Sequence, residues 1–288
     1  MWNPFNRNTI SNASASKRSL QLITQKGMPF AYVEAYKALR TNLNFLSGSG
    51  DVHAFVVTST VPEEAKSNVS VNLALALTES GKKVVLVDCD LRKPVLHRYL
   101  KAGHNLKGVS NVLSRQVALS DALVEPKGIP NLTFLPAGTT PPNPSELLSQ
   151  PQMQEMVATL RGSYDFVILD APPISMVTDA AVIGRIVDGA LFVVRSKYAS
   201  TDAVKTALEK LQDAGVKVLG AVLTRYDAKK SLKRSDYGYG YYYYNSNYSY
   251  GTPPPDGISE SAAEKSCLTS KNRHNGKEKH SVHTEDET

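Results

Sequence analysis

Six short apolar runs, which alternate with helical patterns, constrain the fold of this chain more than any other feature. Each run is rich in Val, Leu, Ile, Phe or Ala. The predicted strands are 54–58, 84–87, 132–135, 166–169, 190–194 and 216–223, and helices are predicted near 31–45, 67–80, 152–161, 175–186 and 201–214. Apolar strands that alternate with crossover helices form a mostly parallel sheet with helices on both faces. The predicted fold class is therefore α/β.

Composition divides the chain into three parts. Residues 1–28 are rich in Ser, Asn, Thr and Lys and are predicted to form a flexible arm, and 29–226 form the folded domain. Residues 227–288 hold a tyrosine-rich run and then scarcely any apolar residue. Such a segment buries too little surface to offset its ordering entropy, so we predict a disordered tail.

Cysteine content and hydropathy predict a cytoplasmic protein. The two cysteines, Cys89 and Cys267, are too few and too far apart for a disulfide framework or a zinc site, which indicates a reducing compartment. No apolar run approaches the ~20 residues that span a bilayer, and the N-terminus lacks the apolar core of a signal peptide. The net charge of +6 fits an anionic partner without choosing one, and a slight lysine excess on an ordinary surface explains it equally well.

The first predicted strand leads into STVPEEAKSN at 59–68 and then into a helix. This order is typical of a phosphate-binding loop, in which backbone N–H groups and the helix dipole face the phosphates. Lys66 would reach the β- and γ-phosphates, and the Ser67 hydroxyl would ligate magnesium. An ordinary strand-to-helix turn explains the segment alone about equally well. The candidate nucleotide-binding residues are Ser59, Pro62, Glu63, Glu64, Ala65, Lys66, Ser67 and Asn68.

Aspartates follow two other apolar strands. Asp88 and Asp90 end the run at 84–87 and would face the same way if the strand continued. Two such carboxylates are costly without a cation or a proton between them, whereas a helix-capping turn would explain only one. Asp170 ends the run at 166–169, where P-loop enzymes place an acidic residue that supports magnesium. The three elements together are more specific than any one of them.

These motifs resemble those of the bacterial tyrosine kinase (BY-kinase) family. Its Walker A′ pattern is matched by VVLVDCDLRKP and its Walker B strand by FVILDAPP. Two further segments look like the family, PAGTTPPNPSELLSQP at 136–151 and FAYVEAYKALRTNLNF at 30–45. The resemblance covers about 29–225 and the tyrosine cluster. It departs at the loop, where the family has glycine at the positions of Glu63 and Ala65.

The resemblance implies an ATP- and Mg²⁺-dependent protein-tyrosine kinase that phosphorylates itself and regulates capsular or extracellular polysaccharide synthesis. Asp88 and Asp90 would act with Lys66 in catalysis, Asp88 as the acceptor of the phenolic proton. Magnesium would be held by Ser67, Asp88, Asp90 and Asp170. The expected acceptors of phosphate are the clustered tail tyrosines Tyr237, Tyr239, Tyr241, Tyr242, Tyr243, Tyr244, Tyr248 and Tyr250.

The resemblance also implies partners. The family's Glu-x-x-Arg-x-x-Arg motif, which supports ring-like self-association, corresponds to Glu34, Lys37 and Arg40, with Lys37 in place of the first arginine. A separate transmembrane polysaccharide co-polymerase would activate the kinase and hold it at the inner face of the membrane, and a tyrosine phosphatase would reverse the modification. No nucleic-acid partner is expected, because the tyrosine run contains no Phe or Arg.

The missing glycines leave two other functions open. Glycine permits positive φ and close approach of backbone N–H groups to phosphates, and Glu63 adds a negative charge near the anion site. We therefore expect weakened nucleotide binding, which would suit a catalytically weak or inactive scaffold that accepts phosphate. A partitioning-type ATPase is the third hypothesis, but the additional early lysine of that group is absent from 59–62.

Overall fold

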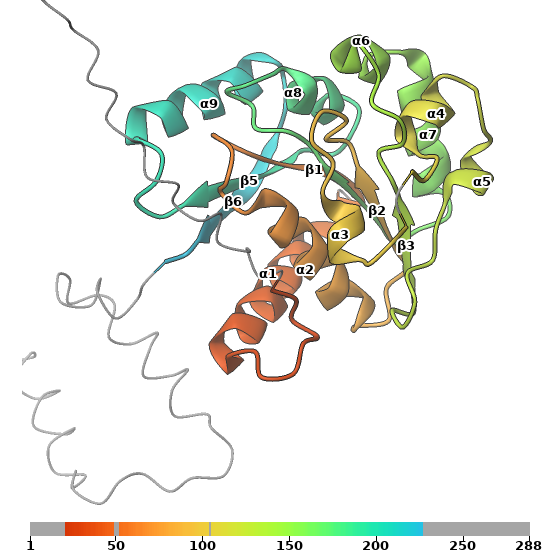
Figure 1. Ribbon diagram of the computed structural model, residues 1–288. Helices are drawn as coiled ribbons and strands as arrows, with labels where there is room; N and C mark the ends of the chain where they lie inside the picture. The colour runs from red at the N-terminus through yellow and green to blue at the C-terminus, as the bar shows by residue number, and fades with distance from the viewer. Residues whose placement is uncertain (1–20, 49–51, 104, 227–288) are drawn as a thin grey trace, which may run out of the picture. The chain divides into compact units, whose positions relative to one another are not determined.

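The computed structural model describes residues 21–48, 52–103 and 105–226, so the predicted tail acceptors lie outside the described residues. Within them, six parallel strands form one sheet in the order β3-β2-β4-β1-β5-β6 (Figure 1). The strands are β1 Ala54–Ser59, β2 Val84–Asp88, β3 Leu132–Leu135, β4 Phe166–Asp170, β5 Ala190–Arg195 and β6 Val218–Thr224. The predicted parallel α/β sheet is confirmed.

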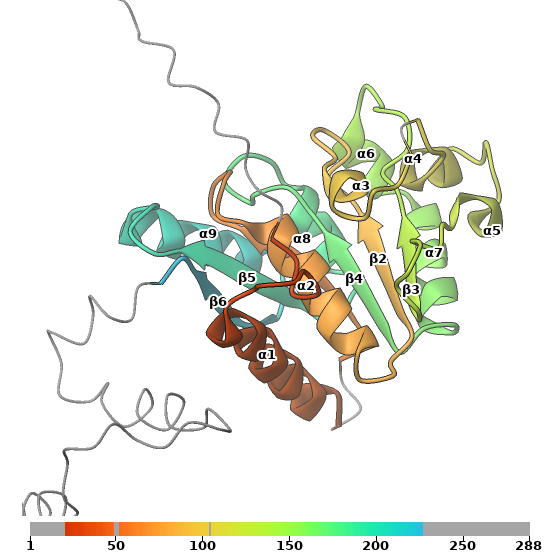
Figure 2. The same ribbon diagram turned by 60° about the horizontal axis from the view of Figure 1, so that its bottom comes forward.

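Helices cover both faces of the sheet and enclose two apolar cores (Figure 2). One face carries α1 Phe30–Gly48, α2 Lys66–Thr78 and α3 Leu96–Tyr99. The other carries α4 Val109–Leu113, α5 Leu119–Ala122, α6 Pro144–Leu148, α7 Pro151–Arg161, α8 Asp179–Gly184 and α9 Thr201–Asp213. Strand β1 serves both, since Phe55 and Val57 face the first core while Ala54 and Val56 face the second. This alternation explains why the predicted strands are apolar throughout.

The segment after β4 differs from the prediction. A helix was expected over 175–186, but α8 begins only at Asp179. The residues before it run beside the end of β1: the Thr58 hydroxyl donates to Pro172 O at 2.8 Å, and Ile174 N donates to Ser59 O at 3.0 Å. These bonds hold the backbone of this segment against β1, a turn follows at 174–176, and the helix begins only after it.

The N-terminal boundary also differs from the predicted flexible arm at 1–28. Residues 21–27 pack against α2, and Ile23 is buried. Ile23 N donates to Asn72 Oδ1 at 2.8 Å, and Asn72 Nδ2 donates to Gln21 O at 2.9 Å. The side-chain amide of Asn72 thus bonds to backbone groups that a helix or strand would otherwise satisfy. The folded part therefore begins before residue 29.

Asp188 bonds to the amino end of β1 and to the last residue of α7, and its loss should destabilise the fold. Its carboxylate accepts the N–H groups of His53 (2.7 Å) and Ala54 (2.8 Å) and an Arg161 N–H (2.6 Å). Burial opposes ionisation, but these bonds hold the pKa of Asp188 below its usual value. We expect Asp188→Ala to lower the free energy of unfolding by about 1–3 kcal/mol at pH 7, measured by urea denaturation.

The pH dependence of this effect has a definite sign. Because the folded-state pKa is depressed, the stabilisation is present above the usual aspartate pKa and is lost as the pH falls through the lower, folded-state value. The difference between wild type and Asp188→Ala should therefore shrink as the pH is lowered below 4. A difference that stayed constant into acid would contradict the assignment of the stabilisation to the ionised carboxylate.

Candidate active site

The predicted catalytic side chains meet at the carboxyl ends of β1, β2 and β4. Asp88 and Asp170 are register partners on the adjacent strands β2 and β4. Lys66, the first residue of α2, places Nζ 3.1 Å from Asp90 Oδ2 and 3.2 Å from Asp170 Oδ2. The Ser67 hydroxyl donates to Asp170 Oδ2 at 2.6 Å. The structure thus brings Lys66, Ser67, Asp90 and Asp170 into one cluster, at the edge where ligands of parallel sheets bind.

Burial and charge give this cluster unusual acid–base properties. Asp88, Asp90 and Asp170 are buried. Burial and the neighbouring Asp170 raise the pKa of Asp88 to about 8, although Lys66 and the Leu96 N–H oppose the shift. Burial would lower the pKa of Lys66, but Asp170 and Asp90 more than compensate and raise it. The site therefore combines a fixed ammonium charge with a carboxyl group that titrates near neutral pH, which suits proton transfer.

Asp88 and Asp90 were expected to face the same way if the strand continued through both, and this condition is not met. Strand β2 ends at Asp88, and Asp90 reaches Lys66 from the turn that follows. Asp88 accepts N–H bonds from Asp90 and from Leu96, the first residue of α3, both at 3.2 Å. Asp88 thus bonds within the turn and to the amino end of α3, while Asp90 supplies the contact with Lys66.

The loop between β1 and α2 adopts left-handed backbone geometry at two residues that are not glycine. Glu63 and Ala65 each have φ 71°. These are the positions at which the resembled family has glycine. Side-chain-bearing residues in this conformation cost about 1–2 kcal/mol each. The backbone therefore keeps a glycine-type conformation without the residues that adopt it most easily.

Besides Lys66 and Ser67, three other predicted nucleotide-binding residues use their side chains within the protein. Asn68 Oδ1 accepts the hydroxyls of Tyr32 (2.9 Å) and Tyr36 (3.3 Å), and Asn68 Nδ2 donates to Gln21 O at 2.8 Å. The Ser59 hydroxyl donates to Val61 O at 3.0 Å. Glu64 is buried and contacts backbone N–H groups, among them that of Val61.

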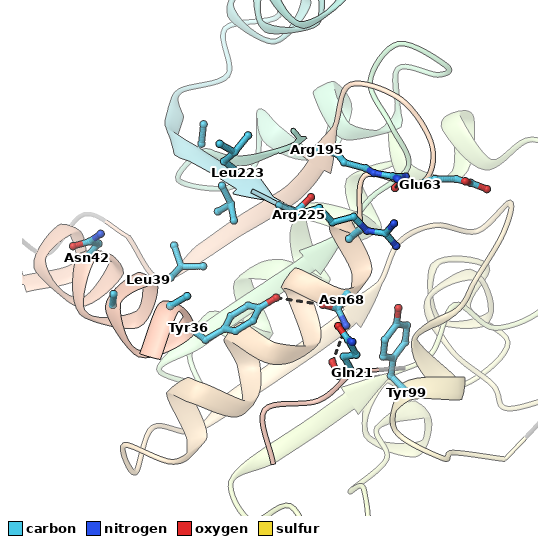
Figure 3. A pocket seen from close by; sticks show the side chains of 16 residues that line it. Gln21, Tyr36, Leu39, Asn42, Glu63, Asn68, Tyr99, Arg195, Leu223 and Arg225 are labelled. Carbon is cyan, nitrogen blue, oxygen red and sulfur yellow. Dashed lines mark hydrogen bonds between the residues drawn. The ribbon is translucent and has the colours of Figure 1, made fainter. Parts of the chain in front are cut away.

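A pocket of about 620 Å³ lies beside this loop, between α1 and the end of β6 (Figure 3). Its polar side includes Asn68, Tyr99, Arg195 and Arg225. Figure 3 shows Tyr99 near Asn68, and both arginines at the side of the pocket that carries Glu63. Neither arginine was predicted from the sequence, although each lies at or just after the carboxyl end of an apolar strand, as the predicted aspartates do.

The donor set fits magnesium held jointly with phosphates. Among the described residues, no group of three or more His, Cys, Asp or Glu side chains is arranged to hold a metal ion. Magnesium in P-loop proteins takes few protein ligands and completes its shell with phosphate and water oxygens. The Ser67 hydroxyl and the Asp170 carboxylate, 2.6 Å apart, offer oxygen ligands of this kind.

Comparisons with known proteins agree with this geometry. A family model described as an AAA domain matches residues 64–218. The tyrosine-protein kinase YwqD of Bacillus subtilis is 37% identical over 205 residues, 71% of this chain and 84% of that protein. The kinase domain of the Escherichia coli tyrosine kinase ETK superposes with a TM-score of 0.64 at 34% identity, covering 68% of this chain and 77% of that one. The septum site-determining protein MinD of Pyrococcus horikoshii, complexed with Mg-ADP, gives 0.53 at 25% identity, covering 64% and 72%.

The parallel sheet, the loop before α2 and the acidic strand ends define a P-loop nucleotide-binding protein. Within that class, the chain belongs to the bacterial tyrosine kinase (BY-kinase) family of capsular and exopolysaccharide synthesis.

The helix predicted to support self-association uses its charged residues within the chain. Glu34 and Lys37 form an ion pair at 2.7 Å on the surface of α1. Arg40 Nη1 donates to Ala76 O at 2.8 Å, near the carboxyl end of α2. A cation at this position satisfies an orphan carbonyl and interacts favourably with the helix dipole. Arg40 is thus placed to stabilise the helix that begins with Lys66.

We expect Arg40→Ala to lower the free energy of unfolding by about 1–2 kcal/mol, because it leaves the Ala76 carbonyl without this donor. Lys37→Ala, one turn away, removes only a half-exposed surface pair and should change stability by less than about 0.5 kcal/mol. Urea denaturation at a dilution where sedimentation shows a monomer measures both. Equal effects of the two variants would contradict an intrachain role specific to Arg40.

Proposed function

We propose that this protein is an ATP- and Mg²⁺-dependent tyrosine kinase that phosphorylates its own tyrosine-rich segment and thereby regulates polysaccharide synthesis. The observation that carries the proposal is the cluster of Lys66, Ser67, Asp90 and Asp170 at the carboxyl ends of β1, β2 and β4. Its membership of a family of tyrosine kinases supports the choice of tyrosine as acceptor.

The residues divide the chemistry of phosphoryl transfer among them. The nucleotide phosphates would lie at the amino end of α2, where Lys66 can neutralise the β- and γ-oxygens. Ser67 would hold magnesium with support from Asp170 and Asp90, and the metal would supply further charge neutralisation. The relative MinD is complexed with Mg-ADP, which supports this pair of ligands. The rest of the nucleotide would extend into the pocket that Arg195 and Arg225 line.

Asp88 is proposed to accept the proton of the attacking tyrosine hydroxyl. A phenol with a pKa of about 10 needs a base near neutral pH. With a pKa of about 8, Asp88 is a stronger base than an ordinary carboxylate and is ionised in part at neutral pH. Asp88 lies beside its register partner Asp170 at the strand ends, next to the Lys66 cluster.

Partners are proposed from the family resemblance. A transmembrane polysaccharide co-polymerase would activate the kinase and hold it at the inner face of the membrane, a homo-oligomeric ring would present tails to neighbouring sites, and a tyrosine phosphatase would remove the phosphate. In the part of the chain that the structure describes, no helix has the length and apolarity needed to span a bilayer.

Incubation of the purified chain with ATP and Mg²⁺, followed by phosphotyrosine mass spectrometry, tests the proposal. The chain is assayed alone and with the cytoplasmic segment of its co-polymerase. Phosphate on Tyr237–Tyr250 that disappears in Lys66→Ala is the expected result, because that variant loses the only cation in the Lys66 cluster. No phosphate and no ATP binding under either condition would reject the kinase.

A phosphate-accepting scaffold is the second candidate. The observation in its favour is the left-handed backbone at Glu63 and Ala65, which places non-glycine residues where phosphates approach the loop. Phosphate on the tail only when an active homologous kinase is added would favour the scaffold.

A further inference from the structure

Glu64 lies between Glu63 and Ala65 in the loop that joins β1 to α2 and is fully buried, with 0% exposure. A buried carboxylate is costly unless hydrogen bonds compensate for its lost hydration. Here each oxygen has a backbone donor: Val61 N donates to Oε2 at 2.9 Å, and Arg195 N donates to Oε1 at 3.1 Å. Bonds from backbone N–H groups to an ionised carboxylate are among the stronger hydrogen bonds. The side chain is therefore an internal connector of the loop.

The two donors come from different elements. Val61 lies within the loop itself, whereas Arg195 ends β5. The backbone of Glu64 is held as well, because Thr224 Oγ1 at the end of β6 donates to Glu64 O at 2.9 Å. Arg195 Nη1 also donates to the neighbouring backbone carbonyl, Glu63 O, over a longer distance of 3.4 Å. Glu64 is thus fixed at its side chain and at its backbone against two neighbouring strands.

The residues on either side of Glu64 are the ones with left-handed backbone. Glu63 and Ala65 both have φ 71°, which glycine adopts freely and side-chain-bearing residues disfavour. Without an external restraint, these two residues would favour other backbone conformations. The bonds of Glu64 hold the residue between them in place and so supply that restraint.

We propose that Glu64 is a positioning residue, which holds Glu63 and Ala65 in the left-handed conformation and thereby shapes the loop for nucleotide phosphates. The second part rests on the proposed kinase function, while the first concerns the loop alone. Glu64 acts through the backbone on either side of it and does not need to touch the nucleotide. This role explains how the loop keeps its shape after both glycines are lost.

Glu64→Gln is the sharpest test, because it keeps the shape of the side chain. Glutamine has one acceptor oxygen, so its NH₂ group must face one of the two backbone N–H donors. The full chain is prepared as wild type, Glu64→Gln, the pair Glu63→Gly with Ala65→Gly, and the triple variant. Glu155→Gln, at an exposed site on α7, is the matched control. Thermal unfolding and binding of a fluorescent ATP analogue with Mg²⁺ are measured for each.

We expect Glu64→Gln to lower the melting temperature by roughly 5 °C and to weaken nucleotide binding about tenfold or more. In the background of the two glycines, the same substitution should weaken binding less than threefold and lower the melting temperature by about half as much. Glycine rescue is the decisive result, because a residue that merely stabilised the fold would cost the same in both backgrounds. Glu155→Gln should match wild type.

Equal effects of Glu64→Gln in both backgrounds would overturn the proposal, as would unchanged melting and binding in Glu64→Gln. If wild type binds no nucleotide, the proposed kinase function fails, and the melting temperatures alone still decide whether Glu64 restrains residues 63 and 65. The two failures are therefore distinguishable.

Discussion

Asp88→Asn is expected to reduce the initial rate of tail phosphorylation by about 10²–10⁴-fold, the usual contribution of a general base. Asparagine keeps the size of the side chain and can still accept one N–H bond from Asp90 or Leu96, but it cannot accept the phenolic proton. The resemblance implied a magnesium contact for Asp88, but its two oxygens accept the N–H groups of Asp90 and Leu96, and the proposal assigns magnesium to Ser67, Asp90 and Asp170. The affinity for ATP should therefore change less than about threefold. Quantitative phosphotyrosine mass spectrometry and calorimetric titration with ATP measure the two quantities separately.

The pH dependence of the phosphorylation rate tests the role of Asp88 as a base independently. Burial and Asp170 raise the pKa of Asp88 to about 8, so its proton-accepting form grows as the pH rises from 6.5 to 8.5. The wild-type rate should rise over this range and level off above it, and the residual rate of Asp88→Asn should lack this inflection. Asp213→Asn, at an exposed position at the end of α9, is the control and should follow wild type. A variant Asp88→Asn that keeps more than a third of the wild-type rate would show that the base is another group.

Restoring both glycines, by Glu63→Gly and Ala65→Gly together, should tighten ATP·Mg²⁺ binding by about 10–100-fold. Two effects add up. Glycine adopts the left-handed conformation without the cost of about 1–2 kcal/mol that a side-chain-bearing residue carries, and binding gains the part of that cost that the loop carries only in its nucleotide-bound shape. Removing the Glu63 charge relieves repulsion of about 1–4 kcal/mol from a phosphate 4 Å away, for an effective dielectric between that of water and 20.

Single variants separate the two effects. Glu63→Gln removes the charge and keeps the backbone preference, so its gain in affinity should fall with added salt. Ala65→Gly changes only the backbone preference, and its gain should be nearly independent of salt. Calorimetry at two ionic strengths measures both. If the double variant bound ATP no better than wild type, the loop would already be fully competent, and the explanation for weak binding would be wrong.

The features that the sequence predicts best are those set by short-range chemistry. Strands β1, β2 and β4 are apolar throughout because both of their faces are covered, and an aspartate after such a run can lie only at the carboxyl edge of the sheet. Lys66 and Ser67 alone were explained about equally well by an ordinary strand-to-helix turn, and only the acidic ends of the next strands made the combination specific. These local rules placed Lys66 and Asp170 at the same end of the sheet, and the structure brings them into contact across 104 positions.

Contacts that depend on the path of a turn or on a distant strand were not predicted. Asp90 reaches Lys66 through a turn, which the alternation of strand residues does not describe. The bond from Arg195 N to Glu64 joins residues 131 positions apart and involves a backbone group, which leaves no trace in side-chain composition. The motif likewise predicts that Asn68 faces the nucleotide. In the structure its side-chain amide is bonded to Tyr32, Tyr36 and Gln21, which lie outside the motif.

The amides of Asn68 and Asn72 join three parts of the chain that a motif analysis treats as separate. Through them the N-terminal segment at Gln21 and the helix α1 are bonded to the first two turns of the phosphate helix α2. If rings form through α1, then assembly and nucleotide binding act on the same set of bonds and are thermodynamically linked. The factor by which ATP strengthens self-association must then equal the factor by which self-association strengthens the binding of ATP. The affinity of this protein for ATP would therefore rise or fall with its own local concentration.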